Sequence, residues 1–435
     1  MADRPRTVPI SVVWLAVALA VGALLWHLNV LPGLGRGYML FSNGIDVKVY
    51  RGGGFAVLHG LPVYDEPVYK VWQFTYPPFA ALGAAPLALL GIGATVHVMG
   101  VVNAIMLLTF MLLTLHCLGY ARNWRFWCTG ATLAVGVTLL QPIQTTIWNG
   151  QINLVLGVLV LGGLVLLPGR WRGLGIGLAG GIKLTPLFFL GYLAVTRQWK
   201  AAVVTVVTFA ATVVIGLIGL RGQAVRFWTT TMRDTARIGP EKSAANQSIN
   251  GFLHRLADLG LGQPPEWLWI PIGVLVGVGG LYAAWRAQRA GAVLLAITLT
   301  GMTTCAVSPF SWGHHWVWMA PLLVITLVQA ASSARRGRPV TWLWWVLPPA
   351  LLAVTFAWPV RRLGFEGRPM WGFGSYWWQW DVAASGWQRA GAVITSGAYL
   401  WVLLVTLAVT LWWCARRDPI RFTHNPPSDL PDLVR

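Results

Sequence analysis

Long apolar runs recur along almost the whole chain, and they constrain its fold more than any other feature of the sequence. A helix of about 20 apolar residues crosses the hydrocarbon core of a bilayer. Only 10% of the residues are charged, whereas soluble domains carry about 25%. The pattern therefore predicts an all-α polytopic membrane protein with about 12 membrane helices. We expect these at roughly 8–30, 77–92, 95–119, 127–142, 152–168, 173–196, 200–220, 268–287, 291–308, 315–333, 340–360 and 389–414.

The net charge of +19 comes from short basic clusters between the apolar runs. This arrangement is typical of cytoplasmic loops next to anionic lipid headgroups, and it argues against nucleic acid as a partner. We interpret the first run as an uncleaved span that follows a cytoplasmic N-terminus, because it is too long for a signal peptide. The clusters include Arg4 and Arg6, Arg122 and Arg125, Arg170 and Arg172, Arg197 and Lys200, Arg335 and Arg336, and Arg416 and Arg417.

Two topologies remain open. Strict alternation places the loops 31–76, 221–267, 309–314 and 361–388 outside, but it also places Arg122 and Arg170 outside, against the charge rule. If 77–119 crosses once and 173–196 dips and returns, the basic clusters all fall inside and the loop 143–151 moves outside. In both versions residues 1–414 form one membrane domain, and the polar, proline-rich tail 415–435 is expected to be disordered in the cytoplasm.

The stretch "SNGIDVKVYRGGG" contains Asp46, the single acidic residue between Asp3 and Asp65. Polar and apolar residues from Asp46 to His59 alternate at near-helical spacing, which predicts an amphipathic helix at the membrane surface. A partly desolvated carboxylate there could act as a general base. Alternatively, Asp46 complements the dipole of the helix N-terminus.

Amides and one lysine interrupt two further apolar runs. In "QPIQTTIWNGQINLVL", Asn149 and Gln151 flank a glycine, and amides at membrane depth require partners or a wet cavity. They suit sugar hydroxyls, or they join helices. In "GLAGGIKLTPLFFL", Lys183 is a candidate for binding phosphate, or its ammonium reaches the membrane interface.

Three other polar or aromatic clusters lie in the predicted outside loops. "SPFSWGHHWVWM" places His314 and His315 among tryptophans, where they could hydrogen-bond a phosphate or sugar or anchor the chain at the interface. The strip from Arg233 to Asn250, which includes Asn246 and Gln247, could receive a charged headgroup or be a solvated loop. Tryptophans gather at 361–388, where they could stack on sugar rings or form a membrane belt. No metal-ligand spacing accompanies the histidines or cysteines, so we expect no metal site and no cofactor.

Six of these pieces, in this order, resemble a known family. They are "DVKVYRGGGFAVLHGLPVY", "FTYPPF", "WNGQINLVL", "GIKLTP", "NQSINGFLHR" and "SPFSWGHHWVW". The chain is similar to the actinobacterial polyprenyl-phosphate-mannose-dependent α-mannosyltransferases, integral membrane glycosyltransferases of the C superfamily. Its pieces are most similar to the mycobacterial members that add an α-1,2-linked mannose to phosphatidylinositol mannosides.

This resemblance implies a function for several residues. Asp46 in "IDVKVY" matches the catalytic base of such enzymes. Tyr50, Arg51, Asn149, Gln151, Lys183, Asn246, Gln247, His314 and His315 fall within matching pieces and are candidates for substrate binding. The donor would be polyprenyl-phosphate-mannose and the acceptor a phosphatidylinositol mannoside, with the active site on the extracytoplasmic face of the plasma membrane. Alternatives are a related transferase that uses lipomannan or another lipid-linked sugar, and a lipid-linked sugar flippase.

Overall fold

The computed structural model describes residues 6–334, 341–363, 369–380 and 385–416, and nearly all of them are helical or in short connections. The first half contains α1 (Ile10–Asn29), α2 (Leu31–Leu34), α3 (Ile45–Leu58), α4 (Pro78–Ala88), α5 (Ile92–Cys117), α6 (Trp124–Gly136), α7 (Gln141–Asn149), α8 (Asn153–Leu166), α9 (Gly173–Ile182), α10 (Phe189–Val195) and α11 (Trp199–Leu220). The second half contains α12 (Gly222–Thr229), α13 (Ile249–Asp258), α14 (Trp269–Arg289), α15 (Val293–Val307), α16 (Met319–Ala334), α17 (Thr341–Thr355), α18 (Gly386–Ser396) and α19 (Ala398–Ala415). Residues 417–435, most of the tail predicted to be disordered, lie outside the described residues.

Five stretches among the described residues are long and apolar enough to cross a membrane, and the bent pair α7–α8 would make six. The predicted membrane character is thus confirmed, whereas the count of about 12 membrane helices is not. The reason is that several predicted segments form shorter apolar helices of 10–17 residues, including α4 and α15. The five stretches are Ile10–Leu34, Ile92–Cys117, Trp199–Leu220, Glu266–Arg289 and Ala398–Ala415.

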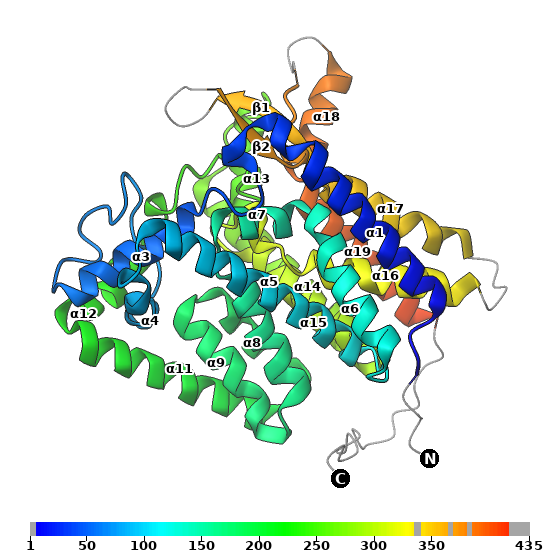
Figure 1. The fold of residues 1–435 in the computed structure, drawn as a ribbon, viewed down its shortest axis with the longest axis horizontal. Coiled ribbons are helices and arrows are strands. Elements are labelled where there is room, and N and C mark those ends of the chain that lie inside the picture. The colour runs from blue at the N-terminus through cyan, green and yellow to red at the C-terminus, as the bar shows by residue number, and fades with distance from the viewer. Residues whose placement is uncertain (1–5, 335–340, 364–368, 381–384, 417–435) are drawn as a thin grey trace.

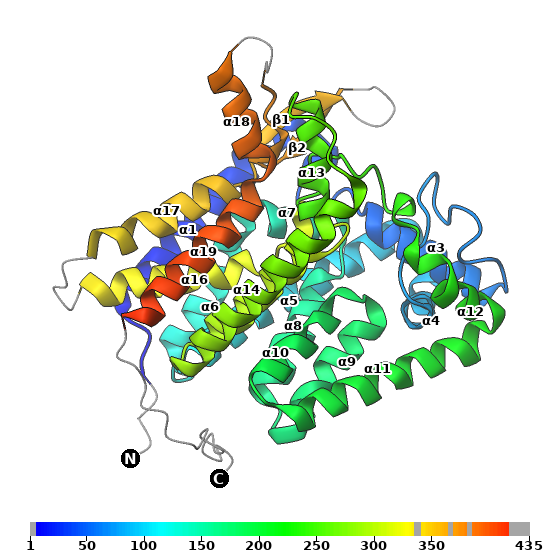
Figure 2. The same cartoon turned by 180° about the vertical axis from the view of Figure 1, so that it is seen from behind.

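The long helices give the molecule two distinct ends (Figures 1 and 2). At one end the backbone of Arg6 pairs with residues 119–121 beyond α5. There too Arg172 contacts Gln198, with 3.5 Å from Nη1 to Oε1, and the Tyr192 hydroxyl donates to Gln288. The cluster at 122–125 therefore lies near the start of α1, and the clusters at 170–172 and 197–200 lie near each other at the same end of the long helices. We call this the basic end.

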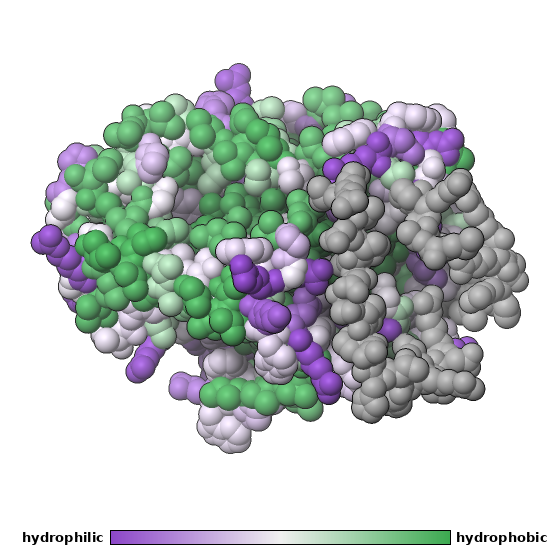
Figure 3. All heavy atoms as spheres, turned by 90° about the horizontal axis from the view of Figure 1, so that it is seen from below, coloured by the Kyte–Doolittle hydropathy of each residue, from purple (hydrophilic) through white to green (hydrophobic). Residues whose placement is uncertain are grey.

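Apolar side chains cover the outer surfaces of the long helices. Leu28 of α1, Ile218 of α11 and Leu275 of α14 are each more than 70% exposed. Figure 3 shows hydrophobic residues over broad areas of one face. Such a surface would be unstable in water, and it is the surface that lipid chains solvate.

Helix α3 packs tightly against its neighbours because three consecutive glycines remove side chains from the contact. A Cβ on Gly52 would lie 2.4 Å from the Val68 carbonyl oxygen, and one on Gly54 would lie 2.3 Å from that of Ala84 in α4. The predicted helix over this stretch is confirmed, and the glycines provide close backbone approach. They fix the position of the helix that carries Asp46 in its first turn.

A sharp bend and a small hairpin complete the end opposite the basic end. Helices α7 and α8 meet at 117°, where Gly150 takes a left-handed conformation with φ of 68° and packs on Val47. Strands β1 (Pro359–Leu363) and β2 (Pro369–Phe373) form an antiparallel hairpin at the outer edge of this end (Figures 1 and 2). The prediction of an all-α fold omitted this hairpin, because its short strands lie in a tryptophan-rich stretch without clear alternation.

Candidate active site

A cavity of about 910 Å³ opens among α3, the α7–α8 bend, the loop before α16 and the β1–β2 hairpin. It gathers residues that are far apart in the sequence: Asp46, Asn149, Gln151, Lys183, His314 and His315 all line it. Sequence motifs that were separately predicted to be functional thus form one site. Asp46 is the one carboxylate among the described lining residues.

Asp46 occupies the first turn of α3, just after Gly44, which begins the helix in a left-handed conformation. The Gly44 amide donates to the Trp148 carbonyl oxygen at 2.8 Å and ties this turn to α7. Burial raises the pKa of Asp46 to about 7, although a Gln151 hydrogen bond and the Lys183 charge act in the opposite direction. A carboxyl with such a pKa can accept a proton near neutral pH.

Gln151 connects Asp46 to two buried phenols. Its Oε1 accepts a 2.8 Å hydrogen bond from Tyr50, and the Tyr50 and Tyr76 hydroxyl oxygens lie 3.1 Å apart. Tyr50 is buried behind this amide and is not a lining residue, whereas Tyr76 reaches the cavity. These contacts orient the Gln151 amide toward the carboxylate. Asn149 is held similarly, since its Oδ1 accepts from Asn43 at 2.8 Å.

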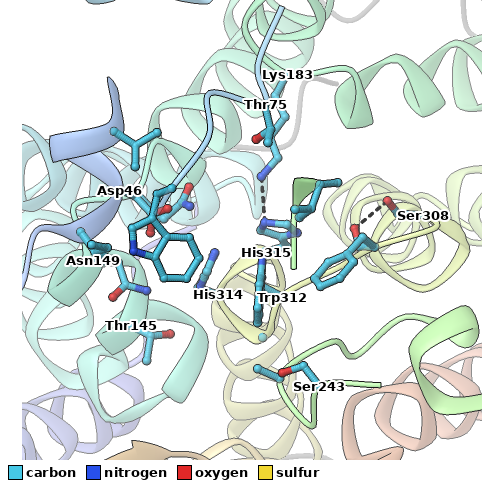
Figure 4. A pocket seen from close by; sticks show the side chains of 18 of the residues that line it. Asp46, Thr75, Thr145, Asn149, Lys183, Ser243, Ser308, Trp312, His314 and His315 are labelled. Carbon is cyan, nitrogen blue, oxygen red and sulfur yellow. Dashed lines mark hydrogen bonds between the residues drawn. The ribbon is translucent and has the colours of Figure 1, made fainter. Parts of the chain in front are cut away.

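Lys183 lies in the break between α9 and the next helical turn, Thr185–Phe188. Its Nζ is 2.9 Å from Nε2 of His315 and 3.3 Å from Oδ1 of Asn153. Figure 4 shows this lysine and His315 joined, with Asp46 and His314 beside the same space. Because an ammonium group can only donate, His315 accepts on Nε2 and carries its proton on Nδ1. Burial, followed by the Lys183 charge, keeps the pKa of His315 well below its usual range.

His314 is fixed through its backbone and keeps its ring available. Its carbonyl oxygen accepts from Thr146 Oγ1 and Asn153 Nδ2, both at 2.9 Å. The ring stacks on Trp312 with centroids 6.2 Å apart, yet the buried Nε2 atom has no protein partner. A buried ring nitrogen without a partner is costly unless a ligand or water binds it. His314 is therefore the histidine that is better placed to contact a substrate.

Besides Tyr50, three more predicted binding residues lie outside the cavity lining. Arg51 Nε donates to the Leu90 carbonyl oxygen at 2.8 Å, just beyond α4. Asn246 and Gln247 are fully buried and support the loop that leads to His314 and His315. Asn246 Oδ1 accepts from the backbone amide of Ser311 at 3.0 Å, and the backbone amide of Gln247 donates to the Ser311 carbonyl oxygen at 2.7 Å. These three residues position backbone and do not face the cavity.

Further polar and aromatic residues line the cavity: Arg237 and Arg362, together with Tyr38, Trp148, Trp371 and Trp377. Arg237 belongs to the basic strip that was predicted to receive a charged headgroup, whereas Arg362, Tyr38 and Trp148 were not predicted. The concentration of tryptophans at 361–388 was the available sequence feature, and two of those tryptophans do reach the cavity. Among the described residues no group of three His, Cys, Asp or Glu side chains is arranged to hold a metal ion.

Comparisons with known proteins show the family to which the chain belongs. The model of glycosyltransferase family 87 matches residues 74–309. A polyprenol-phosphate-mannose-dependent α-(1-2)-phosphatidylinositol mannoside mannosyltransferase of Mycolicibacterium smegmatis is 35% identical over 90% of this chain and 89% of its own. The enzyme of the same name from Mycobacterium tuberculosis is 32% identical over 74% of this chain and 76% of its own.

A polyprenol-phosphate-mannose-dependent α-(1-2)-phosphatidylinositol pentamannoside mannosyltransferase of Mycolicibacterium smegmatis is 33% identical over 77% of this chain and 80% of its own. No solved structure matches this chain. The extent of the family match, together with these identities, shows that the chain belongs to glycosyltransferase family 87.

Proposed function

We propose that this protein transfers mannose from polyprenyl-phosphate-mannose to a phosphatidylinositol mannoside, forming an α-1,2 linkage at the extracytoplasmic face of the plasma membrane. The observation that carries this function is the placement of Asp46: one carboxylate with a pKa of about 7 lies in a large cavity beside Lys183 and two neutral histidines. Two relatives are polyprenol-phosphate-mannose-dependent phosphatidylinositol mannoside mannosyltransferases, which supports this donor and this acceptor class. By the positive-inside rule the basic end would be cytoplasmic, and this supports an extracytoplasmic position for the cavity at the opposite end.

The chemistry requires a single displacement. Asp46 removes the proton from the acceptor hydroxyl as its oxygen attacks the anomeric carbon, and the bond to the phosphate oxygen breaks with its electron pair on the phosphate. One displacement converts a β-linked donor into an α-linked product, and it needs one base and no covalent enzyme intermediate. The polyprenyl phosphate leaves as an anion, so it requires positive charge and hydrogen-bond donors more than it requires an acid.

Lys183 and the two histidines would supply this stabilisation. The Lys183 ammonium stabilises the charge that develops on the phosphate, and His315 holds the ammonium in place through the 2.9 Å contact. His314 Nε2, which has no protein partner, can donate to a phosphate oxygen when it carries the ring proton. Asn149 and Gln151 are placed to bind sugar hydroxyls.

The test is transfer by purified protein in detergent micelles. Wild type, Asp46→Asn and Asp65→Asn are incubated with polyprenyl-phosphate-mannose and a phosphatidylinositol tetramannoside, with and without a chelator. Asp65 is a matched control because it lies outside the cavity and pairs with Arg226. We expect one added α-1,2-linked hexose with wild type and Asp65→Asn, and a loss of about 10²–10⁴-fold with Asp46→Asn. Absence of product from folded wild type would refute the function, and a glycolipid panel and a flipping assay would then test lipomannan transfer and lipid transport.

A further inference from the structure

The β1–β2 hairpin contributes an arginine to the lining of the cavity. Arg362 of β1 lines the cavity, and its guanidinium carbon lies 3.8 Å from the centre of the Trp377 ring. A Cβ on Gly372 of β2 would lie only 2.8 Å from Arg362 Nε and 2.8 Å from the Trp377 ring. The hairpin thus has a glycine where the guanidinium and the indole require space, so the backbone of β2 accommodates the stacked pair.

The charge of Arg362 has no protein counterpart among the described residues. The ion pairs described there join other side chains. Arg362 makes one 3.3 Å hydrogen bond, from Nη1 to the Leu363 carbonyl oxygen, and its buried Nε has no partner. Stacking on an indole holds a guanidinium in one plane and leaves its edge available for bidentate contact with an anion.

Charge balance in the cavity favours two anionic groups. Its described lining contains three cations, Lys183, Arg237 and Arg362, against the carboxylate of Asp46. The proposed donor and acceptor each carry one phosphodiester. Lys183 lies beside Asp46 and His315, where the donor phosphate must leave, so the hairpin arginine is available for the other phosphodiester.

Aromatic and amide side chains connect these two positions. Asn43 and Asn149, which are hydrogen-bonded to each other, line the cavity together with Asp46. Trp148, the neighbour of Asn149 in the chain, stacks with Tyr38, with ring centroids 5.9 Å apart. The Tyr38 hydroxyl in turn accepts from the Trp371 amide of β2 at 3.1 Å. Such a lining suits several sugar rings in a row, because sugar rings stack on aromatic faces and their hydroxyls bind amides.

We propose that Arg362, held on Trp377 over Gly372, binds the phosphodiester of the glycolipid acceptor while the terminal sugar of that acceptor lies at Asp46. This inference rests on the proposed function and adds a determinant of acceptor specificity. The enzyme would select anionic glycolipids at the hairpin and not at the reacting centre.

The test compares two acceptors with three variants. Transfer to a phosphatidylinositol mannoside and to a neutral alkyl mannoside of matched sugar sequence is measured with Arg362→Gln, Gly372→Ala and the control Arg361→Gln. Arg361 is the neighbouring residue on β1, is exposed and lies outside the cavity lining. We expect Arg362→Gln and Gly372→Ala to raise KM for the anionic acceptor by about 10- to 100-fold, since hydrogen bonds to charged groups are worth that much. The kcat at saturation, the KM for the neutral acceptor and the KM for the donor should stay within about twofold.

An equal rise in KM for both acceptors, or a rise in KM for the donor, would overturn the assignment of Arg362 to the acceptor phosphodiester. A second experiment measures binding of the phosphatidylinositol mannoside to two proteins, the Asp46→Asn variant and the Asp46→Asn, Arg362→Gln double variant. The Asp46→Asn change prevents turnover during the measurement. If wild type transfers mannose to neither acceptor, the proposed function fails, while equal lipid binding by the two proteins would refute the phosphodiester site.

Discussion

At the scale of single residues, the site depends on burying one carboxylate beside one ammonium group. Burial alone raises the pKa of Asp46, and Lys183 with Gln151 limits the rise, so that the value is about 7. A carboxylate of ordinary acidity would be a weaker base, and one with no nearby cation would be protonated at neutral pH. In the proposed function, Lys183 therefore adjusts the base strength of Asp46 as well as binding the donor phosphate.

The pH dependence of transfer follows from the pKa of Asp46. Because the base must be deprotonated, kcat/KM should fall tenfold per pH unit below about pH 7 and level off above it. The measurement is kcat/KM between about pH 5.5 and 8 at constant ionic strength, with circular dichroism to confirm folding. A flat profile over this range would show that the group that accepts the proton is not Asp46 with a raised pKa.

Removing the ammonium group should affect both the rate and this profile. In Lys183→Met the leaving phosphate loses its positive partner, and we expect kcat/KM to fall by about 10²-fold or more. The Lys183 charge lowers the pKa of Asp46, so its loss should move the acidic limb of the profile to higher pH. Lys200→Met, at the basic end, is the matched control. A fall in rate without a shift of the limb would contradict the direct coupling of the two residues.

At the scale of elements, the helix α3 that carries Asp46 was predictable from sequence, but its position was not. The spacing from Asp46 to His59 and the glycine run indicated a helix with a closely packed face, and α3 confirms both. The contact between α3 and the α7–α8 bend depends on tertiary packing between residues more than 100 positions apart, which no local pattern specifies. For the same reason Arg51, which looked like a substrate ligand, proves to bind backbone next to α4.

Adding one methyl group to the α3–α4 contact tests this packing. In Gly54→Ala the new Cβ would lie 2.3 Å from the Ala84 carbonyl oxygen, so we expect a loss of about 1–3 kcal/mol in stability and a lower transfer rate. Gly93→Ala is the control, because its Cβ would meet no atom within 4 Å. Thermal unfolding in detergent is the measurement. Equal melting temperatures for the two variants would show that α3 can move away from α4 without cost.

At the scale of the whole molecule, the distribution of charge indicates how the protein sits in the membrane. Basic clusters lie at one end of the long helices, whereas the hairpin and α13 lie at the other (Figures 1 and 2). The hairpin contributes to the cavity lining. Hydropathy was sufficient to predict the membrane class and the approximate helical segments. It could not predict which short apolar segments cross the membrane, since composition does not distinguish a half-helix from a span. It also did not reveal Arg362 as a cavity residue.

Accessibility of introduced cysteines tests this orientation. Lys242→Cys, at the cavity end, should react with a membrane-impermeant maleimide on intact cells, whereas Arg289→Cys, at the basic end, should react only after permeabilisation. Both side chains are exposed, so burial does not bias the comparison. Wild type, with its own four cysteines, gives the background. The reverse pattern would place the cavity in the cytoplasm and contradict the proposed location.

The most direct test of Asp46 as the base is a single-turnover comparison of wild type, Asp46→Asn and Asp65→Asn with both substrates bound. The account predicts that Asp46→Asn binds donor and acceptor within about threefold of wild type but transfers mannose about 10²–10⁴-fold more slowly. Asp65→Asn should match wild type in both. A rate for Asp46→Asn within about tenfold of wild type, or a loss explained entirely by weaker binding, would contradict the role of Asp46 as the base.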